Sequence, residues 1–397
     1  MGALVRRIVE EARWPELWLQ HWVTPIYKKK AVFQAGNYRG VHLSSQLSKV
    51  AERAILPLWQ PHLVNNGSFG DNQFAYQKGR GARDAVAWLT LTWIRALNND
   101  KKVADYCSDV TGAFDRVNSI ELVAKLRKRG LHEQMVRLLE SWLRERQARV
   151  VVSGKCSDPM SLHEMVFQGT VLGPSLWNTF FCDSGDYFAD KGYVQAVYAD
   201  GLNAFREFDG NDDSDLIWSS LFRCQAVLHS WGRDNQVTFD AAKESMHILQ
   251  NGSPSADESY RELWEDFKIL GVWFDCKLTM RSAVKALARE ASRRVTEILR
   301  ARRSLSADKM ITLYKANVLG FIEYRTAAIY HADSWILASV DRVQVRFLDE
   351  LGISEKQAAL QYNLAPLSAR RDIAMLGVIF RSVHDGGPLI FSRISSD

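Results

Sequence analysis

The segment from Val194 to Phe205, VQAVYADGLNAF, places a single carboxylate, Asp200, between two apolar runs. The apolar residues before it are typical of a buried strand, and Asp-Gly followed by a second apolar run predicts a tight hairpin. A carboxylate at the end of such a hairpin is held rigidly and can bind a divalent cation. Because Asp-Gly is also a common turn in its own right, the segment alone predicts the hairpin and leaves the cation site open.

A second carboxylate follows the same pattern in VADYCSDVTGAFDRV. A strand predicted from Val103 ends at Asp109, and a turn at Phe114 leads into a helix predicted from Ser119 to Arg129. Burying an unpaired carboxylate costs free energy, so two of them at neighbouring strand ends predict a cation between them. Enzymes of phosphoryl transfer use such a pair to hold two divalent ions.

Length and composition exclude several classes of protein. A chain of 397 residues with 47% apolar composition can bury a large core in two or three lobes. It has no long uncharged apolar stretch and no secretory signal, so we expect an intracellular protein that does not span a membrane. The five cysteines are odd in number and far apart, which argues against a disulfide framework or a zinc knuckle and for a reducing compartment.

The net charge of +5 is concentrated in one segment. Residues 281–303 contain eight basic and two acidic side chains, a net charge of +6. Such a concentration on one helix is typical of a surface that contacts phosphates. A solvated helix face would have the same composition, so this interpretation also depends on the other segments.

Basic residues flank loops in the first hundred residues. WVTPIYKKK predicts a strand, and Lys28, Lys29, Lys30 and Arg39 bracket a loop that could close on a polyanion. The stretch after it predicts an amphipathic helix. Its apolar positions at helical spacing are Leu43, Leu47, Val50, Ala51, Ala54 and Ile55.

Four further segments complete the pattern. In QFAYQKGRGARDAV, Arg80 and Arg83 lie at a helix N-terminus, which suits backbone phosphates. In FQGTVLGPSLWN, Gln168 and Gly169 form a polar corner before a helix that starts at Gly173. VTFDAAKESMHIL predicts a strand, a turn that carries Lys243 and another strand; FKILGVWFDCKL predicts a hairpin, and the chain is mostly helical after residue 281.

In this order the blocks resemble the reverse transcriptase of non-LTR (LINE-type) retrotransposons and, more distantly, those of group II introns. The resemblance runs from Trp14 to about His331 and rests on seven blocks in sequence. They are WVTPIYKKK with NYRGVHL, QFAYQKGRGARDAV, SDVTGAFDRV, QGTVLGPSLWN, YADG, TFDAAKESMHIL and FKILGVWFDCKL.

The resemblance implies an α+β, right-hand polymerase fold. Fingers would comprise residues 1–102, a palm with an antiparallel sheet packed on helices 103–280, and a helical thumb with a C-terminal extension 281–397. It also implies RNA-directed DNA synthesis by two-metal phosphoryl transfer, with two Mg²⁺ ions that Mn²⁺ can replace. The partners would be an RNA template, a DNA primer and deoxynucleoside triphosphates, in the nucleus or the cytoplasm.

Site residues follow from the same resemblance, position by position. Asp109 and Asp200 match the aspartates that hold the catalytic ions, and Lys243 matches a lysine that protonates the leaving pyrophosphate. Phe114 matches the aromatic residue that blocks a ribose 2′-hydroxyl. The positions that would line the nucleotide or grip its triphosphate are Gln168, Gly169, Arg39 and one of Lys28 to Lys30. The basic residues expected to bind nucleic acid are Arg80, Arg83, Lys285, Arg289 and Arg293.

One departure from the family pattern is Gly201, which stands where the motif YADD has its second aspartate. Losing this carboxylate should weaken metal affinity or misplace the primer end. Two alternatives therefore stay open: an impaired remnant that only binds nucleic acid, and a protein like a group II intron maturase. The chain also begins at the fingers and ends without an RNase H region, so we expect a fragment of a retrotransposon polyprotein, whose other parts supply the endonuclease, or a decayed copy.

Overall fold

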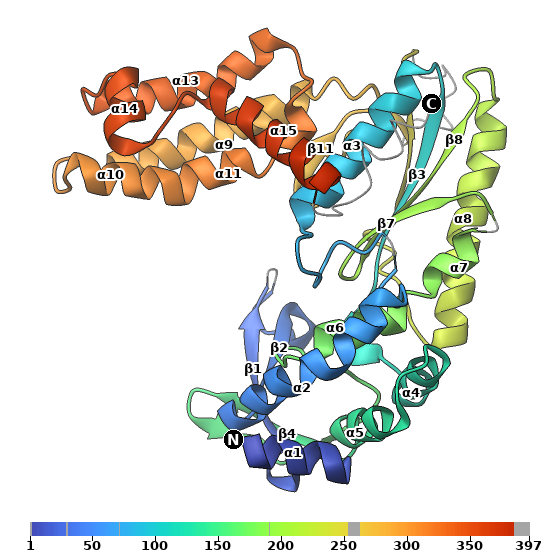
Figure 1. Ribbon diagram of the computed structural model, residues 1–397. Helices are drawn as coiled ribbons and strands as arrows, with labels where there is room; N and C mark the ends of the chain where they lie inside the picture. The colour runs from blue at the N-terminus through green and yellow to red at the C-terminus, as the bar shows by residue number, and fades with distance from the viewer. Residues whose placement is uncertain (1, 29–30, 71, 190, 253–262, 385–397) are drawn as a thin grey trace. The chain divides into compact units, whose positions relative to one another are not determined.

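The computed structural model describes residues 2–28, 31–70, 72–189, 191–252 and 263–384 (Figure 1). The chain forms two compact units, each described here by itself. The first comprises Met1–Tyr76, Cys107–Ala204 and Phe222–Glu244, and the second comprises Gln77–Tyr106, Phe205–Leu221 and Ser245–Asp397. None of the described helices is both long and apolar enough to span a bilayer.

The first unit contains a sheet with the strand order β2-β1-β4-β5, in which β6 also pairs with β4. Strands β1 and β2 form an antiparallel hairpin with Trp22 opposite Leu43, and β1 runs parallel to β4. This hairpin contains the strand predicted from WVTPIYKKK. The strands are β1 (Gln20–Tyr27), β2 (Tyr38–Leu43), β4 (Arg146–Val152), β5 (Lys155–Cys156) and β6 (Met160–Leu162).

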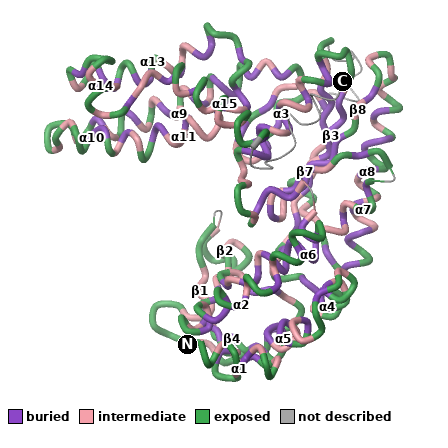
Figure 2. The backbone as a smooth tube through the Cα atoms, viewed as in Figure 1, coloured by how far each residue is buried: buried purple, intermediate pink, exposed green. Residues whose placement is uncertain are grey.

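A second sheet has the strand order β7-β8-β3-β9. It carries both predicted carboxylates, because β3 ends at Asp109 and Asp200 lies in the turn between β7 and β8. Strand β3 is buried along most of its length (Figure 2). Strands β3 and β8 contribute residues to both units, whereas β7 belongs to the first and β9 to the second. The strands are β3 (Lys102–Asp109), β7 (Val194–Tyr198), β8 (Gly201–Phe208) and β9 (Ser245–Leu249).

Helices and aromatic side chains fill the core of the first unit. Trp142 packs edge-on against Phe167 with ring centroids 5.1 Å apart. Phe181 stacks on Trp177 and meets Trp231 edge-on, at 5.2 and 5.0 Å. The helices are α1 (Gly2–Glu11), α2 (Gln46–Asn65), α4 (Ser119–Lys128), α5 (Glu133–Leu143), α6 (Gly173–Phe181), α7 (Ser184–Ala189) and α8 (Ser214–Asn235), of which α8 contributes to both units.

The buried face of helix α2 overlaps only in part with its predicted apolar positions, since Ala51 and Ile55 are buried and the others are not. Leu43 belongs to β2, and Leu47 and Val50 are 54% and 41% exposed. The face that is buried includes a serine and a glutamate, whose polar atoms have partners inside the unit. The buried residues of α2 are Ser48, Ala51, Glu52, Ile55, Trp59 and Leu63.

The second unit is mainly helical, as predicted beyond residue 281. Its core contains Trp93, whose ring contacts Phe205, Phe267 and Phe274 at centroid distances of 6.0, 6.2 and 5.5 Å. The predicted hairpin is present as β10 (Phe267–Ile269) and β11 (Val272–Phe274). The helices are α3 (Ala82–Asn98), α9 (Arg281–Leu299), α10 (Ala307–Tyr314), α11 (Gly320–Glu323), α12 (Thr326–Ile329), α13 (Ser334–Glu350), α14 (Glu355–Tyr362) and α15 (Leu367–His384).

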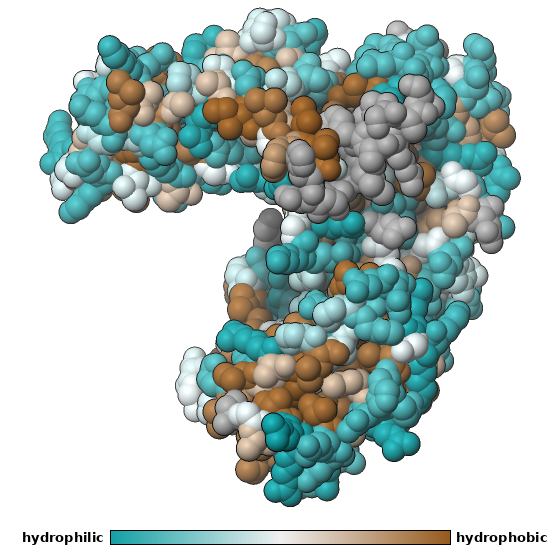
Figure 3. Space-filling view, viewed as in Figure 1, coloured by the Kyte–Doolittle hydropathy of each residue, from teal (hydrophilic) through white to brown (hydrophobic). Residues whose placement is uncertain are grey.

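Helices α9 and α13 lie side by side and run in the same direction. Ion pairs join their starts through Arg281 and Asp333, at 3.0 Å, and their ends through Arg302 and Glu350, at 2.8 Å. Helix α15 carries an exposed apolar stripe, seen as brown atoms in Figure 3 where Figure 1 draws this helix. The stripe consists of Ile373, Leu376, Phe380 and Val383.

Candidate active site

The turn between β7 and β8 consists of Ala199 and Asp200, and Gly201 is the first residue of β8. The hairpin is therefore present, but its turn lies one residue earlier than the predicted Asp-Gly. Ala199 has φ of 59°, in the left-handed region that residues with a Cβ rarely adopt. Such a conformation costs on the order of 1–3 kcal/mol and persists only where neighbouring groups fix it.

Two buried side chains fix Ala199. The side-chain carbonyl oxygen of Gln73, Oε1, accepts hydrogen bonds from the backbone amides of Ala199 and Ala75, at 3.1 and 3.0 Å. The Trp177 indole donates to the Ala199 carbonyl at 2.8 Å. The backbone of the turn is thus held from both sides, and its geometry presents the Asp200 side chain in one position. The sequence prediction missed Gln73, although it lies in the block QFAYQKGRGARDAV.

Asp109 and Asp200 come together as predicted. The amide of Val110 donates to the Asp200 carbonyl at 3.0 Å, which places the two acidic residues on adjacent strand ends. Burial raises the pKa of Asp200, and the negative charge of Asp109 raises it further. The positive charges of Lys243 and Arg39 lower the pKa of this carboxyl and so oppose part of the shift.

Lys243 forms ion pairs with Asp109 and, at 3.5 Å, with Asp240. The Asp240 amide donates to the Asp109 carbonyl at 3.0 Å, which fixes the Lys243 loop beside β3. Burial lowers the pKa of Lys243, but the hydrogen bond and the charge of Asp109 outweigh it and the net shift is upward. The strand predicted before Lys243 is not formed: Phe239 makes one isolated bridge with Val110, and β9 begins at Ser245.

The donor set suits a hard cation. Mg²⁺ is usually held by one or two carboxylates together with substrate phosphates and water, and Asp109 and Asp200 supply two carboxylates with mutual repulsion for a cation to relieve. Within the described residues, no cluster of three or more His, Cys, Asp or Glu could hold a metal ion by itself. The residues therefore fit a metal that shares its coordination with a bound phosphate.

The backbone at Gly201 leaves room for a side chain. A Cβ at this position would have its nearest neighbour among the described atoms at 3.6 Å, the Tyr198 carbonyl oxygen, which is an ordinary contact. The φ of Gly201 also lies outside the left-handed region. The glycine is thus not required by the fold, and an aspartate is compatible with this position.

Phe114 lies beside the carboxylates, on a 3₁₀ turn formed by Ala113–Arg116. Its ring stacks on Trp177 at 6.1 Å and meets Tyr76 edge-on at 6.3 Å. The Phe114 carbonyl accepts a hydrogen bond from the Val166 amide at 2.8 Å. These contacts hold a half-exposed aromatic ring against Trp177, the residue whose indole binds the Ala199 carbonyl.

Lys28 and Arg39 lie on the hairpin of β1 and β2. Both side chains are exposed, and the Lys28 amide donates to the Asn37 carbonyl at 2.9 Å. Burial raises the pKa of Asp115, and the positive charges of Lys28, Arg116 and Arg39 offset only part of this shift. Lys29 and Lys30, the other two predicted lysines, lie outside the described residues.

Gln168 and Gly169 lie directly against strand β2. The Gln168 carbonyl accepts a hydrogen bond from the His42 amide at 2.8 Å. Gly169 has φ of 103°, and a Cβ there would come 2.8 Å from the His42 carbonyl oxygen. Only glycine fits this close approach of two backbones, which explains the first glycine of the block QGTVLGPSLWN.

The predicted nucleic-acid residues belong to the second unit. On α9, Arg293 pairs with Glu290 at 2.7 Å and also with Glu297, whereas Lys285 and Arg289 are exposed and form no salt bridge within the described part of the chain. Hydrogen bonds from Arg293 and Arg294 lower the pKa of Glu290 to about 2, so this acidic partner stays charged. On the other predicted surface, exposed Arg83 and half-buried Arg80 lie at the start of α3.

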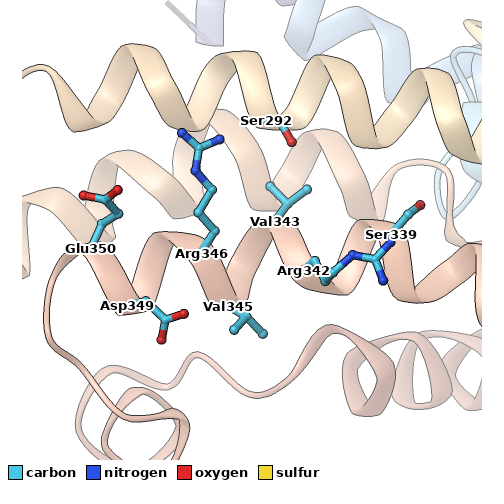
Figure 4. A pocket seen from close by; sticks show the side chains of 8 residues that line it. All are labelled: Ser292, Ser339, Arg342, Val343, Val345, Arg346, Asp349 and Glu350. Atoms are coloured by element: carbon cyan, nitrogen blue, oxygen red, sulfur yellow. The ribbon is translucent and has the colours of Figure 1, made fainter.

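A groove of about 790 Å³ runs between α9 and α13 in this unit (Figure 4). Arg346 points from α13 towards α9 and donates to the Thr296 hydroxyl at 3.4 Å. The groove is also lined by two small hydroxyl residues, Ser292 and Ser339, and by a second arginine, Arg342. The remaining lining residues are Val343, Val345, Asp349 and Glu350.

Comparison with known proteins assigns this arrangement to a family. The family model described as "Reverse transcriptase (RNA-dependent DNA polymerase)" matches residues 26–274. The chain is 26% identical over 305 residues to the RNA-directed DNA polymerase from mobile element jockey of Drosophila funebris, covering 73% of this chain and 32% of that protein. It is 30% identical over 212 residues to the probable RNA-directed DNA polymerase from transposon BS of Drosophila melanogaster, covering 51% and 23%.

These matches extend over only about a quarter to a third of the length of the curated relatives. Among solved structures, the apo telomerase of Candida tropicalis has a TM-score of 0.47 and 12% identity, with 96% of this chain and 71% of that chain covered.

Proposed function

Since the chain belongs to the family of reverse transcriptases (RNA-dependent DNA polymerases), we propose that it extends a DNA primer by copying an RNA template. The observation that carries this proposal is the position of Asp109 and Asp200 on adjacent strand ends, with Lys243 paired to Asp109. Two carboxylates beside basic side chains suit a reaction in which the substrate is a polyphosphate. The α+β class predicted from the sequence agrees with the sheets and helices of both units.

In this mechanism Asp109 and Asp200 would hold two Mg²⁺ ions, which Mn²⁺ could replace. Bound ions supply a lower pKa for the primer 3′-hydroxyl and charge stabilisation for the leaving oxygen. The carboxylates orient the reacting groups for in-line attack on the α-phosphate, and little covalent chemistry is required of the protein. Lys243 is placed to give a proton to the leaving pyrophosphate, since its raised pKa keeps it protonated at neutral pH.

The deoxynucleoside triphosphate would bind beside the β1–β2 hairpin and the Gln168 loop, which pack directly against each other. Lys28 and Arg39 would hold its phosphates by charge-assisted hydrogen bonds. Phe114 would occupy the space of a 2′-hydroxyl and so select deoxynucleotides. Its stacking on Trp177 and its contact with Tyr76 support this role, because a ring held in place excludes a hydroxyl better than a mobile one.

The template–primer backbone would contact the second unit. The predicted residues on α9 are Lys285, Arg289 and Arg293, and those at the start of α3 are Arg80 and Arg83. The groove between α9 and α13 adds Arg342 and Arg346, together with the hydroxyls of Ser292 and Ser339, all of which are suitable donors for phosphate oxygens. In the predicted organisation these helices form a thumb over 281–397, next to fingers over 1–102 and a palm over 103–280.

A second candidate function is favoured by Gly201, the position without its expected carboxylate. In that case the chain would bind nucleic acid without extending a primer. In the polymerase case the template would be the RNA of a retroelement, copied in the nucleus or the cytoplasm, and the rest of a polyprotein would supply the endonuclease.

Primer extension on poly-rA/oligo-dT, with Mg²⁺ and then with Mn²⁺, tests these functions. The wild type would be compared with Asp200→Asn and Gly201→Asp. Extension that is abolished in Asp200→Asn supports a working polymerase. Extension seen only in Gly201→Asp supports a polymerase silenced at one position. If neither the wild type nor Gly201→Asp extends the primer while both bind the duplex, the polymerase proposal is wrong and the binding function stands.

A further inference from the structure

Glu52 is a fully buried carboxylate in the middle of α2. One of its oxygens, Oε2, accepts hydrogen bonds from the amides of Val171 and Leu172, at 2.7 and 3.2 Å. The other, Oε1, accepts from the Ser48 hydroxyl at 3.2 Å and from the Trp142 indole at 3.4 Å. All four partners donate, which is the arrangement that a carboxylate requires.

These bonds satisfy the start of helix α6. The first amides of a helix have no partner inside the helix, and a capping side chain usually accepts from them. Leu172 occupies the capping position of α6 and cannot accept with its side chain. Glu52, which precedes Leu172 by 120 residues, accepts instead from the amide of Leu172 itself and from that of Val171 before it, and its negative charge is favourable at a helix N-terminus.

The same loop is held at its other end by strand β2. Gln168 accepts from the His42 amide, and Gly169 packs against the His42 carbonyl without room for a side chain. The loop from Gln168 to Leu172 is therefore fixed at both ends, by backbone contacts with β2 at its start and by the Glu52 carboxylate at its end. Since both ends are fixed, the loop has few ways to move independently of β2 and α2.

The charge of Glu52 also compensates a buried cation. Arg146 is fully buried and donates to the Trp142 and Trp18 carbonyls, at 2.7 and 3.0 Å. Burial lowers the pKa of Arg146 to about 9, and the charge of Glu52 opposes this shift. Removing the negative charge would thus affect both the α6 cap and the Arg146 site.

We propose that Glu52 is a positioning residue that holds the loop from Gln168 to Leu172 in its nucleotide-binding geometry. The expected effect on nucleotide binding rests on the proposed polymerase function. The expected effect on the mobility of the loop rests on the structure alone. The proposal gives α2 a role in nucleotide binding, through a Glu52 side chain that contacts only backbone atoms of the loop. Glu52 does not contact the substrate in this proposal.

The test compares Glu52→Gln with Ser48→Ala. Glu52→Gln removes the charge and places an amide group opposite donors, whereas Ser48→Ala removes one hydrogen bond to the same carboxylate without touching the loop. We expect Glu52→Gln to raise KM for the deoxynucleotide about tenfold, with kcat and the Kd for template–primer changed less than twofold. Ser48→Ala should change each quantity less than twofold.

A structural readout separates this inference from the polymerase proposal. Hydrogen exchange of the Val171 and Leu172 amides should be at least tenfold faster in Glu52→Gln than in Ser48→Ala, with the Leu122 amide of α4 as an internal reference. This measurement remains decisive if the wild type proves inactive. Equal exchange of the loop amides in the two variants would overturn the inference, whatever the kinetics show.

Glu52→Asp covers the case in which Glu52→Gln fails to fold. The aspartate keeps the charge near Arg146, but its carboxylate is one methylene shorter and cannot make the same bonds to Val171 and Leu172. We expect a folded protein with faster exchange of these two amides and a raised KM. A folded Glu52→Asp variant with wild-type exchange at both amides would contradict the positioning role.

Discussion

Lys243 forms an ion pair with Asp109, the carboxylate at the end of β3. The ammonium group neutralises a carboxylate that the proposed mechanism assigns to a metal ion, so the two cations compete for one ligand. Metal binding would release Lys243 from this carboxylate and leave it available to the leaving group.

Replacing Lys243 with methionine should therefore have two opposite effects. Loss of the proton donor should lower kcat about 100-fold, while loss of the competing charge should lower the Mg²⁺ concentration for half-maximal extension. Single-nucleotide incorporation measured over a range of Mg²⁺ concentrations separates the two effects. Asp240→Asn is the control, because it removes the other partner of Lys243 and leaves the ammonium group present. A higher Mg²⁺ requirement in Lys243→Met would contradict the competition.

Gly201→Asp should increase primer extension. The backbone accepts a Cβ at this position at an ordinary contact distance, so we expect the free energy of unfolding to change by less than about 1 kcal/mol. The added carboxylate should strengthen metal binding, and extension at low Mg²⁺ should rise at least tenfold. Gly201→Asn is matched in size without the charge. If it increased extension equally, the effect would come from the turn geometry and not from metal affinity.

Gln73→Leu should destabilise the turn that presents Asp200. This change leaves the amides of Ala199 and Ala75 without their buried acceptor, at a cost of about 1–3 kcal/mol for each unsatisfied donor. Thermal unfolding should report the loss, and primer extension should fall further than the stability alone explains. Trp177→Phe, which removes the single indole bond to Ala199, should have a smaller effect on extension. Equal extension in Gln73→Leu and the wild type would show that the turn keeps its geometry without Gln73.

The buried histidines predict a loss of stability in acid. Burial lowers the pKa of His21 to about 2 and that of His42 to about 4, and the Arg146 charge adds to both shifts. Below pH 6.5 the unfolded chain binds protons that the folded chain does not, so the free energy of unfolding falls as the pH falls from about 6.5 towards 4. From pH 7 to pH 5 the loss should be about 2 kcal/mol for each histidine.

Unfolding in urea at a series of pH values measures this slope. The two rings contact each other through their Nδ1 atoms at 3.3 Å, and a proton on the accepting nitrogen would place two N–H groups face to face. His42→Gln should therefore reduce the slope between pH 6.5 and pH 5. An unchanged slope in this variant would assign the acid sensitivity to other groups.

Salt dependence should distinguish the cations of α9. Lys285→Ala and Arg289→Ala should each weaken duplex binding and reduce the slope of log affinity against log salt by about 1. Arg293→Ala is the matched control on the same helix, and it should have a smaller effect because Arg293 already pairs with Glu290 and Glu297. If all three variants weakened duplex binding equally, Lys285 and Arg289 would not be the main phosphate contacts of α9.

Local pattern predicted much of the fold. Period-two and period-3.6 runs indicated β3 ending at Asp109, the β7–β8 hairpin, and α6 beginning at Gly173, and the structure contains all three. These elements are specified by residues close together in the sequence. The resemblance then assigned Asp109 and Asp200 to one site, which the bond from the Val110 amide to the Asp200 carbonyl supports.

Long-range polar contacts were not predictable in the same way. The buried face of α2 was assigned from its apolar residues, but Glu52 is buried because its partners come from Val171 and Leu172, more than a hundred residues away. Gln73 gives a similar case, since its partner Ala199 lies 126 residues further along. A polar residue in a buried position is predictable only when its distant partner is known.

The contact between Gly169 and the His42 carbonyl has a consequence for how this protein can vary over time. The contact joins two backbones, so exchange of side chains along β2 leaves it intact. A single-residue insertion or deletion in β2 would shift the whole strand against the glycine and break the contact. We therefore expect lineages of this sequence to tolerate replacements in β2 and to conserve its length.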